Sequence, residues 1–365
     1  MDSTTITYDK YSEINLANSK DMTDTKAELK PRVAIVYNLK RSENEDFVPQ
    51  KTIDSVYGTI KNTLGYHCIL IEAMNETLFD QLLKNQIDIV FNLAEGYHQR
   101  TRESQVPAIC DYLNIEHTGS DATCIGVTLD KTLAKQVIRG SGLNILTPNY
   151  MLYDGQDLNL DLNFSLKFPI IVKLNCGDSS IGLDQMKSVA TNKVELYDRI
   201  ALLWNKFHQP ILCEEYIEGR EFTIGILGND VLGPREILFN DICGRYPIYD
   251  YQCKIADFDG YFQPMNIECP VSLGKEHDNK VHQFARDIFK CLGCRDYARI
   301  DYRINSNGDL YFLELNALPG ITPSWSDLVL ICESYHIGYE HLIERMLTPA
   351  VKRWEERKKL HVHEE

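Results

Sequence analysis

The stretch YARIDYRINSNGDLYFLELNALPGIT, residues 297–322, contains the pattern that decides the fold of this chain. Two β-rich runs, ARIDYRI and LYFLELN, flank Asn305-Ser306-Asn307-Gly308, and the pair Asn-Gly is a strong signal for a tight hairpin turn. Side chains alternate across a strand, so one face of the hairpin should carry four polar groups, Arg299, Asp301, Glu314 and Asn316. The opposite face should pack into a core through Ile300, Tyr302, Leu313 and Leu315.

The polar face of this predicted hairpin has the chemistry of a magnesium site. Asp301, Glu314 and Asn316 offer hard oxygen ligands, and Mg²⁺ commonly completes such a set with water and phosphate oxygens. The guanidinium of Arg299 beside them braces an anion without ever losing its charge. A solvated polar face of an amphipathic hairpin is the alternative interpretation of the same spacing.

Composition limits the class of protein. The chain has 365 residues, 44% of them hydrophobic, so we expect two or three subdomains with substantial cores. A formal net charge of -15 argues against a nucleic-acid or anionic-membrane partner. Residues 1–30 are polar, lack a secretory signal and are predicted to be a disordered or loosely docked extension. Eleven scattered cysteines, an odd number, are expected to be reduced thiols of a cytoplasmic protein.

The first third of the chain predicts an open parallel α/β sheet. Apolar runs alternate with segments of helical periodicity in the order strand 32–38, helix 50–64, strand 66–72, helix 76–85 and strand 87–93. Ligands of such sheets bind beyond the carboxyl ends of the strands. The loop 92–105 follows one of those ends, so it is a candidate substrate loop, although its charged residues are equally typical of a solvated loop.

Three lysines and a small-residue loop suggest phosphate binding. Lys131 and Lys135 share a helical face, where lysines are usually only solvated. Lys173 stands near the end of the predicted strand 168–174, directly before the Gly- and Ser-rich loop 175–182. Such loops present backbone N–H groups to phosphate oxygens, although this one is not a Walker A sequence.

An acidic segment follows the next predicted strand, 209–217. Glu214 and Glu215 end this strand, and extended backbone beside them has N–H and C=O groups suited to reading an adenine edge. Glu221 is placed to accept hydrogen bonds from ribose hydroxyls. The alternative is a charged strand edge that discourages aggregation.

The order of these segments resembles that of ATP-grasp ligases, most closely the D-alanine–D-alanine ligase family. The resemblance extends over about residues 85–347. It is carried by the segments NLAEG, RESQVPAI, TGSDA, TLDKTLAK, GDSSIG, EEYIEGREFTIGIL, YDYQCK and ELNALPGIT. It implies an α/β fold in which an N-terminal open parallel domain precedes a two-subdomain ATP-grasp fold of α+β type.

The resemblance also assigns roles to individual residues. It places the ATP phosphates on Lys131 and Lys173, the adenine on Glu214, Glu215, Tyr216 and Ile217, and the ribose on Glu221. It places two Mg²⁺ ions, or Mn²⁺ instead, on Asp301, Glu314 and Asn316. It gives the oxyanion to Arg299 and a backbone N–H near Gly320, and substrate closure to Ser179, Ser180 and Lys254.

Both amino-acid pockets depart from the family pattern. The usual Gly-Gly loop with its glutamate is replaced by residues 37–45, so Glu43, Glu45 or Glu103 must take the place of that glutamate. The usual Thr-Ser-x-Ser pattern after Gly320 is replaced by Ile321-Thr-Pro-Ser-Trp-Ser326, which makes Ser324 and Ser326 candidates for the second pocket.

We therefore predict an ATP- and Mg-dependent ligase that joins two amino acids through an acyl phosphate. The alternatives are a non-catalytic ATP-binding regulatory protein of the same fold and a ligase for a non-alanine biosynthetic substrate. The expected partners are small amino-acid-like molecules, and a homodimer is compatible with this prediction. The expected parts are the extension 1–30, an N-terminal domain 31–122, a lid subdomain 123–215, a metal-binding subdomain 216–347 and a charged helix or tail 348–365.

Overall fold

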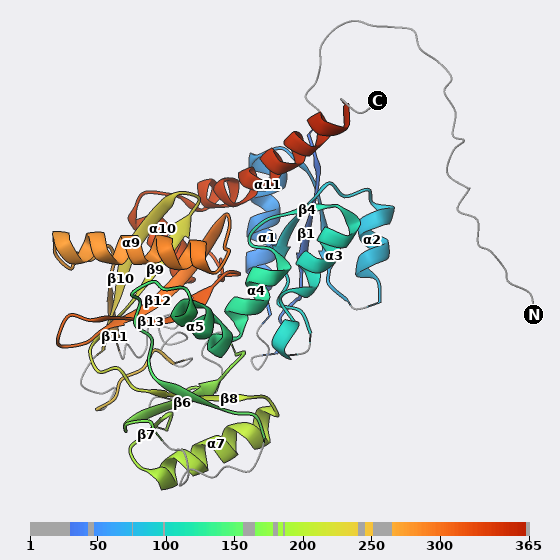
Figure 1. Ribbon diagram of the computed structural model, residues 1–365. Coiled ribbons are helices and arrows are strands. Elements are labelled where there is room, and N and C mark those ends of the chain that lie inside the picture. Colours follow the sequence, from blue (N-terminus) through green and yellow to red (C-terminus); the bar gives the residue numbers. More distant parts are fainter. Residues whose placement is uncertain are drawn as a thin grey trace, which may run out of the picture. The chain divides into compact units, whose positions relative to one another are not determined.

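A computed structural model describes residues 30–42, 47–74, 76–97, 99–155, 165–177, 182–184, 187–239, 245–250 and 265–362. From Pro31 onward the chain forms one unit built on three β-sheets (Figure 1). The predicted N-terminal extension falls almost entirely outside the described residues. Within the described ranges, no helix is both long and apolar enough to cross a membrane.

The first sheet is parallel, with strand order β2-β1-β3-β4. Its strands are β1 (Arg32–Tyr37), β2 (His67–Glu72), β3 (Ile89–Leu93) and β4 (Glu116–His117). The connecting helices are α1 (Gln50–Gly58), the π-helix η1 (Thr59–Thr63), α2 (Leu78–Lys84), the 3₁₀-helix η2 (Gln99–Thr101) and α3 (Gln105–Leu113). Val33 and Ile35 of β1 pack with α1, whereas Ala34 and Val36 pack with α2 and α3. Because both faces are covered, the apolar run is continuous, and the predicted open parallel α/β sheet is confirmed.

The second sheet is antiparallel, with order β11-β10-β9-β12-β13. Its strands are β9 (Arg220–Leu227), β10 (Asp230–Phe239), β11 (Met265–Glu268), β12 (Tyr297–Ile304) and β13 (Leu310–Asn316). One face packs against α4 (Ala122–Leu129), α5 (Lys131–Gly140) and α9 (Lys275–Cys291). The other face packs against α10 (Asp327–Ser334), which the chain follows with α11 (Tyr339–Val362). Helices α4 and α5 share a hydrophobic core with this second sheet. The predicted domain divisions stay predictions.

The third sheet has the order β5-β8-β6-β7 and is covered by one helix. Its elements are β5 (Tyr150–Tyr153), β6 (Ile170–Leu174), β7 (Val189–Ala190), α7 (Lys193–Phe207) and β8 (Ile211–Glu215). The strands predicted at 168–174 and 209–217 are confirmed as β6 and β8, each ending within a few residues of its expected bounds. Leu196, Ile200 and Leu203 of α7 are buried against the sheet, as the helical period of three to four requires.

The β12–β13 hairpin is confirmed, with one correction to its register. Arg299 lies opposite Asn316 and Asp301 opposite Glu314, so the four polar groups share a face. Beyond Asp301 the pairing shifts, and Tyr302 lies opposite Phe312. Leu313 is therefore the extra residue of a β-bulge, which locally breaks the alternation of side chains. Leu313 was predicted to be in the core, but it lines a cleft on the polar side, and Phe312 takes the core position.

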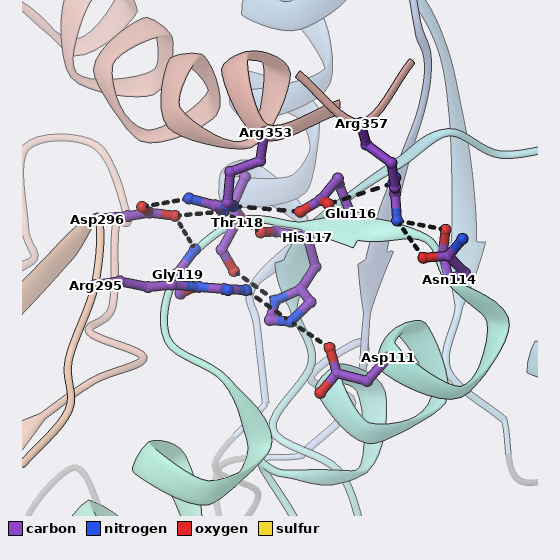
Figure 2. Close-up of polar contacts among 10 residues, drawn as sticks. All are labelled: Asp111, Asn114, Glu116, His117, Thr118, Gly119, Arg295, Asp296, Arg353 and Arg357. Carbon is purple, nitrogen blue, oxygen red and sulfur yellow. Dashed lines mark hydrogen bonds and ion pairs between the residues drawn. The ribbon is translucent and has the colours of Figure 1, made fainter. Parts of the chain in front are cut away.

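Helix α11 is tied to the first sheet and to the segment before β12 by arginines (Figure 2). Arg353 donates to both carboxylate oxygens of Asp296, at 2.8 and 2.9 Å, and lies 3.2 Å from an oxygen of Glu116. Trp354 beside it is buried. The predicted charged C-terminal helix or tail is thus, as far as Val362, the docked second half of α11.

Candidate active site

A cleft of about 830 Å³, part of it open to solvent, lies between the third sheet and the β12–β13 hairpin. Its basic lining residues are Lys131, Lys173 and Arg303. Its acidic lining residues are Glu214, Glu215, Glu221, Asp301 and Glu314. Its apolar lining includes Pro148, Ile171, Leu174, Ile217, Ile248 and Leu313. Apolar walls with a few convergent polar groups are usual for small-molecule sites.

The start of α5 is held against the loop that follows β6. Asp130 caps the helix, accepting hydrogen bonds from the Leu133 N–H at 3.0 Å and the Asn175 side chain at 2.8 Å. The Asn175 carbonyl accepts from the Lys131 N–H at 3.2 Å. A helix cap of this kind satisfies otherwise unpaired N–H groups. It also fixes Lys131, the first residue of α5, at the edge of the cleft.

Lys131 and Lys173 reach the same cleft from different elements. The Lys131 Nζ donates to the Gly177 carbonyl at 2.5 Å and lies 3.3 Å from Glu314. Lys173 extends from β6 and forms an ion pair of 2.8 Å with Glu214. The Lys131 ammonium group therefore stands beside the start of the Gly- and Ser-rich loop, and Lys173 lines the same cleft. Their predicted contact with phosphates stays a prediction.

A buried ion cluster underlies the cleft, and one of its members, Lys135, is a helix-face lysine of a kind that is usually solvated. Glu214 is fully buried between Lys173 and Lys135, whose Nζ lies 2.9 Å from its carboxylate. Burial alone would raise the pKa of Glu214, but the two lysines outweigh it and the pKa is lowered. Burial lowers the pKa of Lys135 to about 8, against the opposing influence of Glu214. Lys135 is thus not a solvated helix-face lysine, and the Glu214 side chain faces lysines.

The segment predicted to hold adenine forms one wall of the cleft. The N–H groups of Glu215 and Tyr216 donate to the carbonyls of Asn149 and Pro169, each at 2.9 Å. The Glu215 carboxylate accepts from the Asn149 side chain at 3.0 Å. These bonds hold the segment to its neighbours, and its predicted contact with adenine stays a prediction.

Glu221 lines the cleft and is paired with Arg303. Its carboxylate accepts from the Arg303 Nε at 2.9 Å. The same guanidinium donates to the Ile217 carbonyl at 2.8 Å and lies 4.6 Å from the centre of the Tyr216 ring. Arg303 continues the alternation of Arg299 and Asp301 along β12, a signal from which it could have been found.

The predicted metal ligands are brought together by the hairpin. Asp301 and Glu314 face each other across β12 and β13 and both line the cleft, next to Lys131. The Asn316 amide lies 3.4 Å from Asp301. Within the described ranges, no group of three or more His, Cys, Asp or Glu side chains gathers as a metal site. Two carboxylates and an amide oxygen nevertheless fit Mg²⁺, which takes few protein ligands and keeps water or phosphate oxygens for the rest.

Arg299 is held by carboxylates on two sides. Its Nε and Nη2 lie 3.2 and 3.1 Å from the two oxygens of Asp301. Its Nη1 lies 3.5 Å from Asp327, at the start of α10. Burial alone would lower the pKa of Arg299, but Asp301 and Asp327 raise it well above its usual value. Asp327 was missed because no local pattern links α10 to β12.

A second, smaller cavity adjoins the predicted metal ligands. It is lined by Glu103, Thr128, Lys131, Glu314 and Asn316, among others. Glu103 is buried and lies 3.0 Å from the guanidinium of its neighbour Arg102. Of the three glutamates predicted to replace the usual substrate-binding one, Glu103 therefore lies beside the predicted metal ligands. Glu43 and Glu45 fall outside the described residues.

The loop after Gly320 is stabilised by its own hydrogen bonds. The Ser326 hydroxyl is buried and accepts from the Thr322 N–H at 2.9 Å. Ser324 is exposed and has a φ of 59°. Neither serine lines the two cavities described above. The predicted substrate-covering residues Ser179, Ser180 and Lys254 fall outside the described residues.

Known proteins with similar sequences include D-alanine–D-alanine ligases. Residues 142–348 match a family model described as the D-ala D-ala ligase C-terminus. A D-alanine–D-alanine ligase of Aquifex aeolicus is 29% identical over 319 residues, which cover 87% of this chain and 100% of that protein. An uncharacterised protein of Sinorhizobium fredii, y4sG, is 32% identical over 273 residues, 73% of this chain and 75% of that protein.

Solved structures share the fold. The D-alanine–D-alanine ligase of Bacillus anthracis complexed with ATP has a TM-score of 0.69 at 23% identity, covering 90% of this chain and 99% of its own. The VanG D-Ala:D-Ser ligase of Enterococcus faecalis has a TM-score of 0.66 at 18% identity, covering 88% of this chain and 99% of its own. The α/β fold with an ATP-grasp part, expected from the sequence, is thereby confirmed.

Proposed function

The chain belongs to the D-alanine–D-alanine ligase family, and from that premise we propose how its cleft joins two amino acids. It is an ATP-dependent, ADP-forming ligase that makes a peptide bond. The observation that carries the proposal is the convergence of Lys131, Lys173, Asp301 and Glu314 on one cleft from four elements, α5, β6, β12 and β13. A protein that only stored a nucleotide would not need Arg299, whose guanidinium contacts the cleft residue Asp301.

The first step activates a carboxylate, which is a poor electrophile at neutral pH. Apolar walls and Ile217 hold the adenine, Glu221 accepts from the ribose, and Lys131 and Lys173 face the phosphates. The two ammonium groups neutralise charge on the transferred phosphoryl group, so catalysis here is mostly positioning and electrostatics. Asp301, Glu314 and Asn316 would hold Mg²⁺, which would supply further neutralisation of phosphate charge. The product of this step is an acyl phosphate and ADP.

The second step is attack by the amine of another amino acid on the acyl carbon. The tetrahedral carbon that forms carries an oxyanion, and Arg299 with a backbone N–H near Gly320 stabilises it. Removal of one such donor typically costs about 3–4 kcal/mol of transition-state stabilisation. Phosphate leaves as the peptide bond forms. Closure by Ser179, Ser180 and Lys254 would exclude water, which otherwise hydrolyses the acyl phosphate.

Glu103 supports a role for the small cavity in holding the first substrate. A carboxylate beside Lys131 and Glu314 suits the ammonium group of an amino acid whose carboxylate points toward the phosphates. Because the loop of residues 321–326 departs from the family pattern, the second amino acid need not be alanine. We therefore propose an amino-acid dipeptide as the product and leave its side chains to experiment.

The test is a panel of D- and L-amino acids, singly and in pairs, with Mg-ATP. We expect ADP and phosphate release together with a dipeptide detected by mass spectrometry. Mn²⁺ in place of Mg²⁺ should support the same reaction. ATP binding without turnover in any pair would instead favour the non-catalytic alternative. The homodimer and the cytoplasmic location expected from the sequence stay predictions.

A further inference from the structure

The guanidinium of Arg299 has two neighbours that differ in origin. Asp301 lies two residues away on the same strand, so its contact at 3.1 and 3.2 Å is local. Asp327 belongs to α10, and its oxygen lies 3.5 Å from Nη1, the remaining nitrogen. The two carboxylates thus occupy opposite edges of one planar cation. With both present, the guanidinium plane has few orientations left.

Asp327 is itself anchored. It is buried, with 7% of its surface exposed, and accepts from the Nε of Arg235 on β10 at 3.2 Å. Arg235 is buried to the same degree, at 6%. Helix α10 approaches β9 closely at Gly225, the residue opposite Arg299, where an added Cβ would lie 2.8 Å from Leu328. Helix packing therefore sets the position of Asp327 beside Arg299.

We propose that Asp327 is a positioning residue that aims Arg299 at the oxyanion of the second step. The inference rests on the proposed function and adds a residue to it. Asp301 alone would leave Arg299 free to follow that carboxylate when it turns toward a metal ion. Asp327 holds the other edge of the guanidinium and keeps it at the acyl carbon. Displacement of a catalytic group by about 1 Å can cost about 100-fold in rate.

The two steps of the reaction separate this role from a merely structural one. Transfer of the phosphoryl group creates no oxyanion on carbon, so it does not need an aimed Arg299. Attack by the amine creates such an oxyanion, so this step needs Arg299 in the correct orientation. When the second step is slow, water takes the acyl phosphate instead, and ADP forms without dipeptide.

The experiment measures ADP and dipeptide separately by rapid quench in wild type and Asp327→Asn. It uses Mg-ATP with D-alanine or, if the panel ranks another amino acid first, with that one. In Asp327→Asn we expect dipeptide formation to fall by about 100-fold, with single-turnover ADP formation and the KM for ATP unchanged. Asp327→Glu should recover part of the dipeptide yield per ADP. In an Arg299→Lys background, Asp327→Asn should cause little further loss, because both changes act through one group.

A matched control and a fallback keep the test decisive. Glu236→Gln removes another buried carboxylate, on β10 and paired with Arg220 at 2.6 Å, and should leave the yield unchanged. If Asp327→Asn does not fold, Arg235→Gln loosens Asp327 and should lower the yield in the same direction, though less.

Equal loss of ADP and dipeptide, or no loss of either, would overturn the inference while the wild type still supports the proposed function. A wild type that makes no dipeptide would remove both.

Discussion

Two charged regions of this molecule use the same residue types for different ends. In the cleft, Lys131, Lys173 and Glu314 line about 830 Å³ of space. In the α11 network, which we define as Arg353, Asp296 and Glu116, the charges meet one another across elements and line neither cavity described above (Figure 2). An ion pair that faces a cavity is therefore a candidate for binding or catalysis. An ion pair that is surrounded by other parts of the protein stabilises the packing of the elements it joins.

The largest expected effect comes from the buried carboxylate beneath the cleft. Glu214→Gln leaves Lys135 and Lys173 facing each other without an anion, and removal of one partner of a buried pair typically costs about 3–5 kcal/mol. We expect the free energy of unfolding, measured in urea, to fall by that amount. The rise in melting temperature caused by ATP should also be lost. Adding Lys135→Met should restore part of the stability, and a single variant as stable as wild type would contradict the assignment.

The next effect concerns rate and not stability. Arg299→Lys keeps the charge but loses the planar guanidinium and its several N–H donors, so we expect kcat to fall by about 10²–10³-fold. ATP should still raise the melting temperature, because the nucleotide wall is intact. Arg220→Lys, on the neighbouring strand and paired with Glu236, is the control and should leave kcat unchanged. An Arg299→Lys enzyme with normal kcat would place the oxyanion elsewhere.

Changes in the α11 network should lower stability and leave the reaction rate unchanged. Arg353 keeps a quarter of its side chain exposed, so solvent weakens the stabilisation from its ion pair with the buried Asp296. We expect Arg353→Leu to lower the free energy of unfolding by about 2 kcal/mol. At temperatures where the variant is folded, its kcat should equal that of wild type. Arg345→Leu on the same helix removes a more exposed pair with Asp230 and should cost under about 1 kcal/mol. A loss of kcat in Arg353→Leu would blur the distinction between the two regions.

The smallest effect is a dependence on pH at the cap of α5. Burial alone would raise the pKa of Asp130, but hydrogen bonds from Thr132 and Asn175 outweigh it, so the pKa lies below the usual 3.8. A carboxyl of this kind binds fewer protons when folded. Its stabilising contribution is present above pH 3.8 and is lost as the pH falls through the folded-state pKa.

We therefore expect Asp130→Asn to cost about 1 kcal/mol at neutral pH, and less in acid. Urea unfolding of both proteins from pH 7 to pH 3 measures the difference. A stability difference between the two proteins that grows toward low pH would contradict the expected direction of the pH dependence.

Local patterns were enough for much of the site. The Asn-Gly turn and the alternation of β12 and β13 placed Arg299, Asp301, Glu314 and Asn316 on one face. The bulge at Leu313 was not predicted, because an inserted residue leaves no mark in an alternating apolar run. Lys135 was left undecided, since the sequence does not say which helix face another strand will cover.

The sequence by itself determined the strands β1, β2 and β3, the hairpin face and the order of charged segments, since each depends on neighbours along the chain. Tertiary structure alone decided that Glu214 lies between two lysines, that Asp327 meets Arg299 and that Arg353 meets Asp296. Those contacts join residues tens of positions apart along the chain. Their geometry follows from how helices and sheets pack, and side-chain periodicity carries no record of that packing.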